Sequence, residues 1–247
     1  MQKNLPLLKV PDQSMYYSRR LYFYNLSIVT VSSSLLSNKS VAVYSWCEHE
    51  MQKSSNQISS TVLDNLCEKI QTGELDSVKT VRLVADGCPG QNKNSSVMTM
   101  CCFWLFKHAP INTEHIELIF PVTGHSFLPS DRVFGLLEKE LKTKSTIVEV
   151  DDYHEVFSKY RTLKLLGKDW VAYDWKQEAK EVVKPTQNLH FQLSKCKRLI
   201  MKWSKSRKNI LVSGEMNYNL NLGSPLSITK KKQSFSSVNP KLIPLGC

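Results

Sequence analysis

Several features of secreted and membrane proteins are missing from this chain. Its 247 residues include seven cysteines, an odd number, and none of them forms a CxxC pair, so a disulfide framework is not indicated. The sequence has no run of about 18 apolar residues and no apolar segment of a secretory signal at its start. These absences predict an intracellular protein of the cytosol or nucleus, without a membrane span, whose thiols are reduced and mostly buried.

Acidic residues are scarce in the last part of the chain. Residues 176–247 hold 14 Lys and Arg against three Glu, and therefore carry the whole net charge of +11. Such asymmetry predicts a polyanionic partner, DNA in the first place, although a solvated linker or a localisation signal would show the same charge. Residues 195–208 are expected to form a basic helix in which Trp203 could stack on a base. The candidate nucleic-acid contacts are Lys195, Lys197, Arg198, Lys202, Trp203, Lys205, Arg207 and Lys208.

Hydrophobic periodicity predicts alternating strands and helices over most of the chain. Residues 16–31 and 40–46 are expected to pair as a hairpin, and residues 1–8 are the only candidate for a strand before it. Helices are predicted at 56–70, 94–108 and 130–142, and strands at 78–85 and 115–122. The strand at 78–85 is almost continuously apolar, which is typical of a central strand buried on both faces. This order indicates a mixed sheet covered by helices.

The periodicity fades beyond about Tyr173. We therefore divide the chain into a core at residues 1–175 and a basic, partly irregular extension at residues 176–247. No internal repeat is visible in either part.

One acidic residue, Asp86, stands where the strand at 78–85 ends. Gly87, Pro89 and Gly90 follow it and force a turn. Ligands of open sheets with crossover helices gather beyond the carboxyl ends of strands, and a carboxylate there suits Mg²⁺. Alternatively, Asp86 only opens the turn by binding its own backbone.

A second group of candidate site residues lies at and before the helix at 130–142. Asp131 and Glu138 are seven residues apart, nearly two turns, so they share one helix face. His125 precedes them as a possible proton carrier or metal neighbour. Each also has a structural alternative: Asp131 suits the first turn of a helix, Glu138 can pair with Lys142, and a lone histidine before a helix is often structural.

Together, these segments resemble a family of transposon-derived proteins of insects and other invertebrates, of the DUF7869 type. Their shared domain is similar to the integrase core of DDE-type transposases. The resemblance covers about the first 140 residues, more than half of the chain. The matching stretches, of which the last two are the longest and most distinctive, are Gln2–Leu7, Tyr16–Asn25, Asn56–Ser60, Asp86–Asn94 and Gly124–Lys139.

This resemblance implies a ribonuclease H-like fold, a mixed five-stranded sheet flanked by helices, in which the first three strands form an antiparallel meander. Asp86 would be the second acid of a metal-binding triad, and Asp131 the third, with Glu138 as the runner-up. The cofactor would be Mg²⁺ or Mn²⁺. In the family the first acid lies just before the Gln-x-x-Leu-Pro segment, and this chain starts at Met1. We therefore expect an N-terminally truncated core.

Three classes of function remain open at this stage. The first is metal-dependent DNA strand cleavage or transfer, with the catalytic residues Asp86, Asp131 or Glu138, and His125. The second is a non-catalytic nucleic-acid-binding protein, or an inert transposon relic, because loss of one carboxylate misplaces the metal. The third is a scaffold without a nucleic-acid role. We expect the first by ancestry and the second in the present chain.

Overall fold

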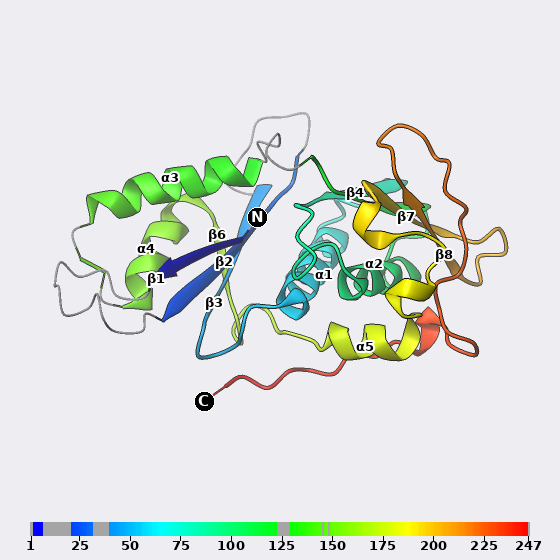
Figure 1. Ribbon diagram of the computed structural model, residues 1–247. Coiled ribbons are helices and arrows are strands. Elements are labelled where there is room, and N and C mark those ends of the chain that lie inside the picture. Colours follow the sequence, from blue (N-terminus) through cyan, green and yellow to red (C-terminus); the bar gives the residue numbers. More distant parts are fainter. Residues whose placement is uncertain are drawn as a thin grey trace. The chain divides into compact units, whose positions relative to one another are not determined.

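Two sheets, each with its own helices, make up the part of the chain that the computed structural model describes. That part comprises residues 2–6, 21–31, 40–122, 129–144, 146–147 and 149–246. Unit 1 is formed by Met1–Lys53, Phe127–Val171 and Pro244–Cys247, and unit 2 by Ser54–Ser126 and Ala172–Ile243 (Figure 1). Each unit holds a mixed sheet of four strands, whereas the sequence predicted one sheet of five. The mixed α/β class is confirmed.

The sheet of unit 1 begins with the predicted meander. β1 (Gln2–Pro6) pairs antiparallel with β2 (Tyr22–Val29), and β2 pairs antiparallel with β3 (Val41–Cys47). This confirms the hairpin and the short opening strand. β6 (Thr162–Leu165) then adds to the other side of β3 as a parallel neighbour, so the order is β1-β2-β3-β6.

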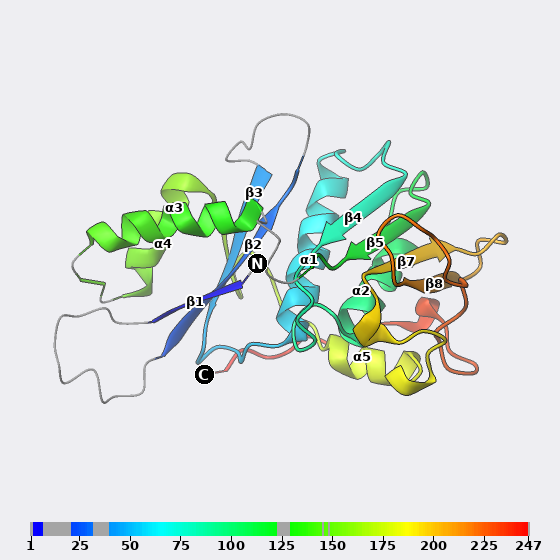
Figure 2. The same ribbon diagram turned by 45° about the horizontal axis from the view of Figure 1, so that its top comes forward.

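Two helices cover one face of this sheet, α3 (Pro129–Thr143) and α4 (Val150–Tyr160). Figures 1 and 2 show both helices on the same side of the strands. Alternation along β2 and β3 directs one set of side chains towards the helices. That shared core includes Phe23, Val43, Leu137 and Phe157. Leu136, also on α3, is 53% exposed, so only part of the apolar surface of the helix faces the sheet.

Unit 2 contains three helices that pack on one another. They are α1 (Ser55–Gln71), α2 (Ser95–Lys107) and α5 (Trp175–Val182). A side-chain oxygen of the residue before each helix accepts a backbone N–H of its first turn, which is why the helices begin where they do. The predicted helices at 56–70 and 94–108 are confirmed as α1 and α2, and α2 is buried almost all round.

The sheet of unit 2 has the order β4-β5-β7-β8. β4 (Thr80–Val84) runs parallel to β5 (His115–Ile119), and β7 (Arg198–Trp203) is antiparallel to both β5 and β8 (Ile210–Glu215). α2 lies against the face of this sheet that carries the apolar residues. Short 3₁₀ turns at Thr186–Asn188, Leu193–Lys195 and Phe235–Ser237 connect the remaining segments.

Two predictions about this sheet were wrong. β4 is an edge strand with Arg82 exposed and Val84 51% exposed, not a central strand, because apolar composition does not reveal how many neighbours a strand has. The basic helix at 195–208 is in fact β7 and a turn. Leu199, Ile200 and Met201 form a short, buried apolar run, and a run of this length favours a buried strand.

The predicted boundary at residue 175 does not coincide with the division between the units. Residues 172–243 supply α5, β7 and β8 to unit 2, beside α1, α2, β4 and β5. None of the helices in the described ranges combines the length and hydrophobicity that a membrane span requires.

Candidate functional site

Asp86 lies in the turn that follows β4, and its side chain is exposed. Its Oδ1 accepts a hydrogen bond from the backbone N–H of Cys88 at 3.0 Å and another from Nδ2 of Asn92 at 2.8 Å. The first contact is the turn-opening geometry that we considered as an alternative. Both contacts involve Oδ1, so the geometry orients the carboxylate while Oδ2 has no hydrogen bond within the described ranges.

The rest of the turn is held by its own residues. The carbonyl oxygen of Cys88 accepts the backbone N–H groups of Gln91, Asn92 and Lys93 at 3.2, 2.9 and 3.0 Å. Nδ2 of Asn94 donates to the carbonyl oxygen of Pro89 at 3.0 Å, while Oδ1 of Asn94 caps α2. These contacts explain why the turn uses side-chain amides at these positions.

Lys93 ties the Asp86 turn to a distant part of unit 2. Its Nζ donates to the carbonyl oxygen of Ser194 at 2.7 Å and lies 5.1 Å from the centre of the Phe120 ring. Partial burial lowers the pKa of the Lys93 amine. Asn92, Lys93 and Asn94 were not predicted as site residues, although the polar run Gln-Asn-Lys-Asn after two glycines was a signal for them.

We expect Asn92→Ala to loosen the Asp86 turn. The substitution removes a hydrogen bond worth about 1 kcal/mol, so hydrogen exchange of the Cys88 amide should accelerate roughly fivefold. Asn112→Ala is the matched control, because Nδ2 of Asn112 makes a comparable bond at 2.9 Å, to the carbonyl oxygen of Asp76. Unchanged exchange at Cys88 would show that Asn92 does not hold the carboxylate.

The other predicted acids lie on α3 in unit 1, whereas Asp86 belongs to unit 2. Asp131 and Glu138 do occur in the same helix, and Glu138 is half-buried. The Asp131 side chain and the whole of His125 lie outside the described residues. Among the side chains that are described, no three His, Cys, Asp or Glu residues gather as a metal site. The triad therefore remains a prediction.

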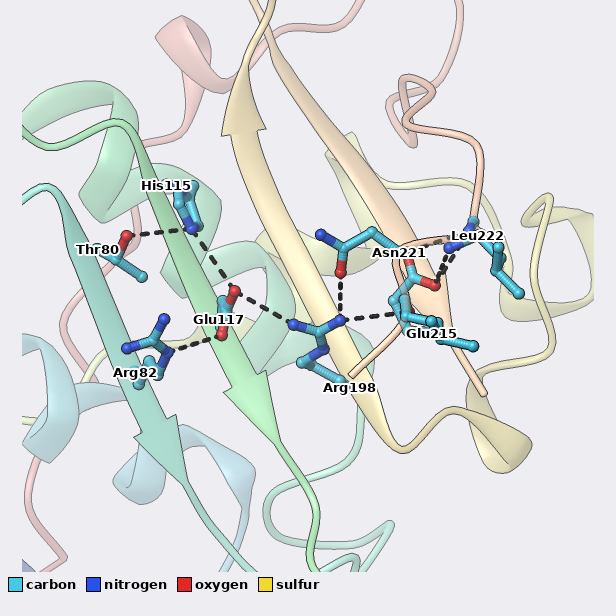
Figure 3. A network of polar contacts seen from close by, with 10 residues as sticks. Thr80, Arg82, His115, Glu117, Arg198, Glu215, Asn221 and Leu222 are labelled. Atoms are coloured by element: carbon cyan, nitrogen blue, oxygen red, sulfur yellow. Dashed lines mark hydrogen bonds and ion pairs between the residues drawn. The ribbon is translucent and has the colours of Figure 1, made fainter. Parts of the chain in front are cut away.

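A buried charged group in the middle of the unit 2 sheet was not foreseen (Figure 3). Glu117 on β5 has a side chain only 7% exposed, and its carboxylate lies 3.1 Å from Nε of Arg82 and 3.4 Å from Nη1 of Arg198. Nε2 of His115 is 3.6 Å away. Arg82 faces Glu117 directly in the parallel register. The sequence signal was a charged residue in each of two apolar strands, HIELI and TVRLV.

Arg198 extends this group towards the loop after β8. Its Nη2 donates to the carbonyl oxygen of Leu220 at 3.4 Å and also to Oδ1 of Asn221 (Figure 3). Glu215, opposite Arg198 in the register, accepts the backbone N–H groups of Leu222 and Gly223. Arg198 was a candidate DNA contact. Its guanidinium is buried instead and directed at protein acceptors, so we assign it to the fold.

Most of the other basic candidates are open to solvent. The exposed ones are Lys195, Lys197, Lys202, Lys205, Arg207 and Lys208. Trp203 is half-buried and its ring packs against that of Phe106, with centroids 5.4 Å apart. That contact gives the indole a packing role within unit 2.

Comparison with protein families gives one match. A family described as "Domain of unknown function (DUF7869)" matches residues 29–209. The chain belongs to this family. The matched range of this DUF7869 chain contains the Asp86 turn, α3, Glu117 and β7, which confirms the DUF7869 part of the resemblance. No curated protein and no solved structure matches the chain.

Proposed function

We propose that this DUF7869 chain is a ribonuclease H-like domain derived from a transposase, which binds DNA and whose strand-cleavage activity is lost or impaired. The observation that carries the proposal is the Asp86 turn. It leaves the carboxyl end of β4 with an exposed carboxylate held through one oxygen by Cys88 and Asn92.

The order of elements supports the ancestry. An antiparallel meander of β1, β2 and β3 comes first, and β4 and β5 then follow as parallel strands joined through α2. Such parallel pairs require a crossover connection. The present structure departs from the family expectation, since β4 and β5 share a sheet with β7 and β8, whereas the meander shares its sheet with β6.

The chemistry of the ancestral reaction explains why we propose reduced cleavage. In-line phosphoryl transfer with two divalent cations uses carboxylates to hold both ions. Asp86 would hold Mg²⁺ or Mn²⁺, which would supply Lewis-acid chemistry. Among the described side chains, no three His, Cys, Asp or Glu residues gather to hold such an ion. With fewer carboxylates the cations are held less firmly, so catalysis should suffer before DNA binding does.

The alternative function is an active metal-dependent nuclease. It is favoured by the exposure of Asp86 and by the Oδ2 atom that the turn leaves without a hydrogen bond in the described part of the chain.

A nicking assay with supercoiled DNA in Mn²⁺ separates the two functions. We expect wild-type protein and the Asp86→Ala variant to show the same background nicking and the same retention of DNA in a mobility-shift gel. Asn112→Ala, another exposed position of unit 2, controls for preparation differences. Wild-type nicking that disappears in Asp86→Ala would instead support the active nuclease. Failure of wild type to retain DNA would overturn the DNA-binding assignment.

A further inference from the structure

A small hollow opens on the polar face of the unit 2 sheet, beside the β7–β8 turn. Its volume is about 260 Å³, less than the roughly 300–1,000 Å³ of pockets that hold whole organic ligands. This size suits one small hydrated anion better than a base or a nucleoside. Its lining includes Glu114, His115, Lys202, Ser204, Lys205 and Arg207.

The fold itself brings these basic groups together. His115 on β5 and Lys202 on β7 are direct partners in the antiparallel register, so both side chains stand on the same face of the sheet. The turn that follows β7 adds Lys205 and Arg207. Ser204 closes this turn, because its backbone N–H donates to the carbonyl oxygen of Asn209 at 2.8 Å.

Arg207 occupies an uncommon backbone conformation in that turn, with φ at 53°. Non-glycine residues adopt such angles in a small fraction of cases, and they cluster at functional positions. One donor of the guanidinium, Nη1, binds the carbonyl oxygen of Ile111 at 3.3 Å. This contact anchors the side chain beside the hollow, and a guanidinium has further donors for a ligand.

The charge of the hollow is positive. Lys202, Lys205 and Arg207 contribute three cations, and Glu114 is the one acidic residue of the lining. Its carboxylate lies 3.6 Å from Nζ of Lys79, a further exposed cation. The nearby carboxylate of Glu117 on β5 is paired with Arg82 and Arg198. The three lining cations therefore exceed the negative charge that could neutralise them.

We propose that this hollow binds one phosphate group of the DNA backbone, with Arg207 as a forked donor and Lys202 and Lys205 as point charges. This inference rests on the proposed DNA binding, and it assigns one phosphate contact to the hollow. It also separates the basic candidates into two groups, because Lys202, Lys205 and Arg207 converge on one hollow whereas Arg198 is used by the fold.

Point variants are the appropriate test, since deleting residues 176–247 would remove β7 and β8 from the sheet. The probe is a labelled DNA duplex whose affinity is measured by fluorescence anisotropy at a series of salt concentrations. Lys202→Gln/Lys205→Gln should weaken binding and reduce the slope of log K against log salt by about 0.9, the value for one phosphate contact. Lys231→Gln/Lys232→Gln removes the same charge from exposed positions outside the hollow and should leave the slope unchanged.

Two further measurements keep the outcomes distinct. Lys202→Arg keeps the charge and should retain the wild-type slope, and hydrogen exchange of β7 shows whether the glutamine variant is folded. In parallel, wild-type protein is titrated with inorganic phosphate while the ring signals of His115 are followed by NMR. We expect saturable shifts that the Lys202→Gln/Lys205→Gln variant loses.

The results separate this inference from the proposed function. DNA binding with an unchanged slope in the folded variant would overturn the hollow as the phosphate site, as would His115 signals that phosphate does not move. A wild type that binds no DNA but shows the His115 shifts would overturn the proposed function and leave an anion site. A slope reduced equally by the Lys231→Gln/Lys232→Gln control would overturn the assignment to this hollow.

Discussion

Replacing Glu117 with glutamine is expected to lower the free energy of unfolding of unit 2 by about 3–5 kcal/mol. The side chains of Glu117 and Arg198 are 7% and 9% exposed, so the substitution leaves a buried guanidinium without its countercharge. The contact with Arg82 contributes much less, because that side chain is 62% exposed and exposed ion pairs are worth little.

Urea denaturation combined with native-state hydrogen exchange in β5 and β7 measures this loss in unit 2 alone. Glu114→Gln is the matched control, since its ion pair with Lys79 is exposed, and it should cost under about 1 kcal/mol. Glu117→Leu combined with Arg198→Met should recover much of the stability, because it removes both buried charges. A loss in Glu117→Gln no larger than in Glu114→Gln would contradict the role of the buried pair.

Trp104→Ala is expected to cost about 3–5 kcal/mol, the range for truncation of a large core aromatic. Trp104 is fully buried on α2, the helix that contacts α1, α5 and three strands of the unit 2 sheet. Removing the indole would leave a cavity where these elements meet. Thermal or urea denaturation measures the loss. Ile111→Ala, at a position 77% exposed, should stay within about 0.5 kcal/mol of wild type.

The Trp104→Phe variant separates the effect of the indole donor from the effect of the lost ring volume. The indole Nε1 of Trp104 is buried without an acceptor in the described part of the chain, and an unsatisfied donor is itself destabilising. Phenylalanine removes that donor and keeps much of the ring, so we expect its cost to be less than half that of alanine. Equal losses in the two variants would show that the donor has a partner.

The spacing of apolar residues was sufficient to predict those helices and strands whose buried side chains recur at regular intervals. α1 was predictable because Ile58, Leu63 and Leu66 recur at helical spacing and are all buried. The hairpin of β2 and β3 was predictable because apolar residues fill both runs and turn formers separate them. In each case the information lies within about 30 consecutive residues, so local periodicity is sufficient to read it.

The partition into two sheets was not predictable in this way. It depends on β7, whose Leu199 and Met201 are buried but stand among basic residues that made the stretch resemble a solvated helix. β7 occupies the side of β5 opposite to β4, and within the described ranges no strand pairs with the other side of β4. Which strands become neighbours is decided by packing between distant segments, and single-sequence periodicity does not contain it.

In the candidate site, too, some residues were predictable from the local sequence and others depend on the fold. Asp86 was found because a strand end followed by glycines is a local signal. Asn92 and Lys93 were missed because their partners, a carboxylate oxygen and the carbonyl group of Ser194, are defined only by the fold. The basic residues of the extension were found by charge alone, and charge could not separate Arg198, inside the sheet, from Lys202 on its surface.

The interleaving of the two units has a consequence for synthesis of the chain. β3 can pair with β6 only after residues 162–165 are synthesised. β5 can pair with β7 only after residues 198–203 are synthesised. During translation, the nascent chain therefore carries two strands with an unpaired edge until their neighbours are synthesised. Such edges are prone to intermolecular pairing. Slow elongation between β5 and β7 should raise the demand for chaperones, and a nascent chain released before residue 198 should aggregate.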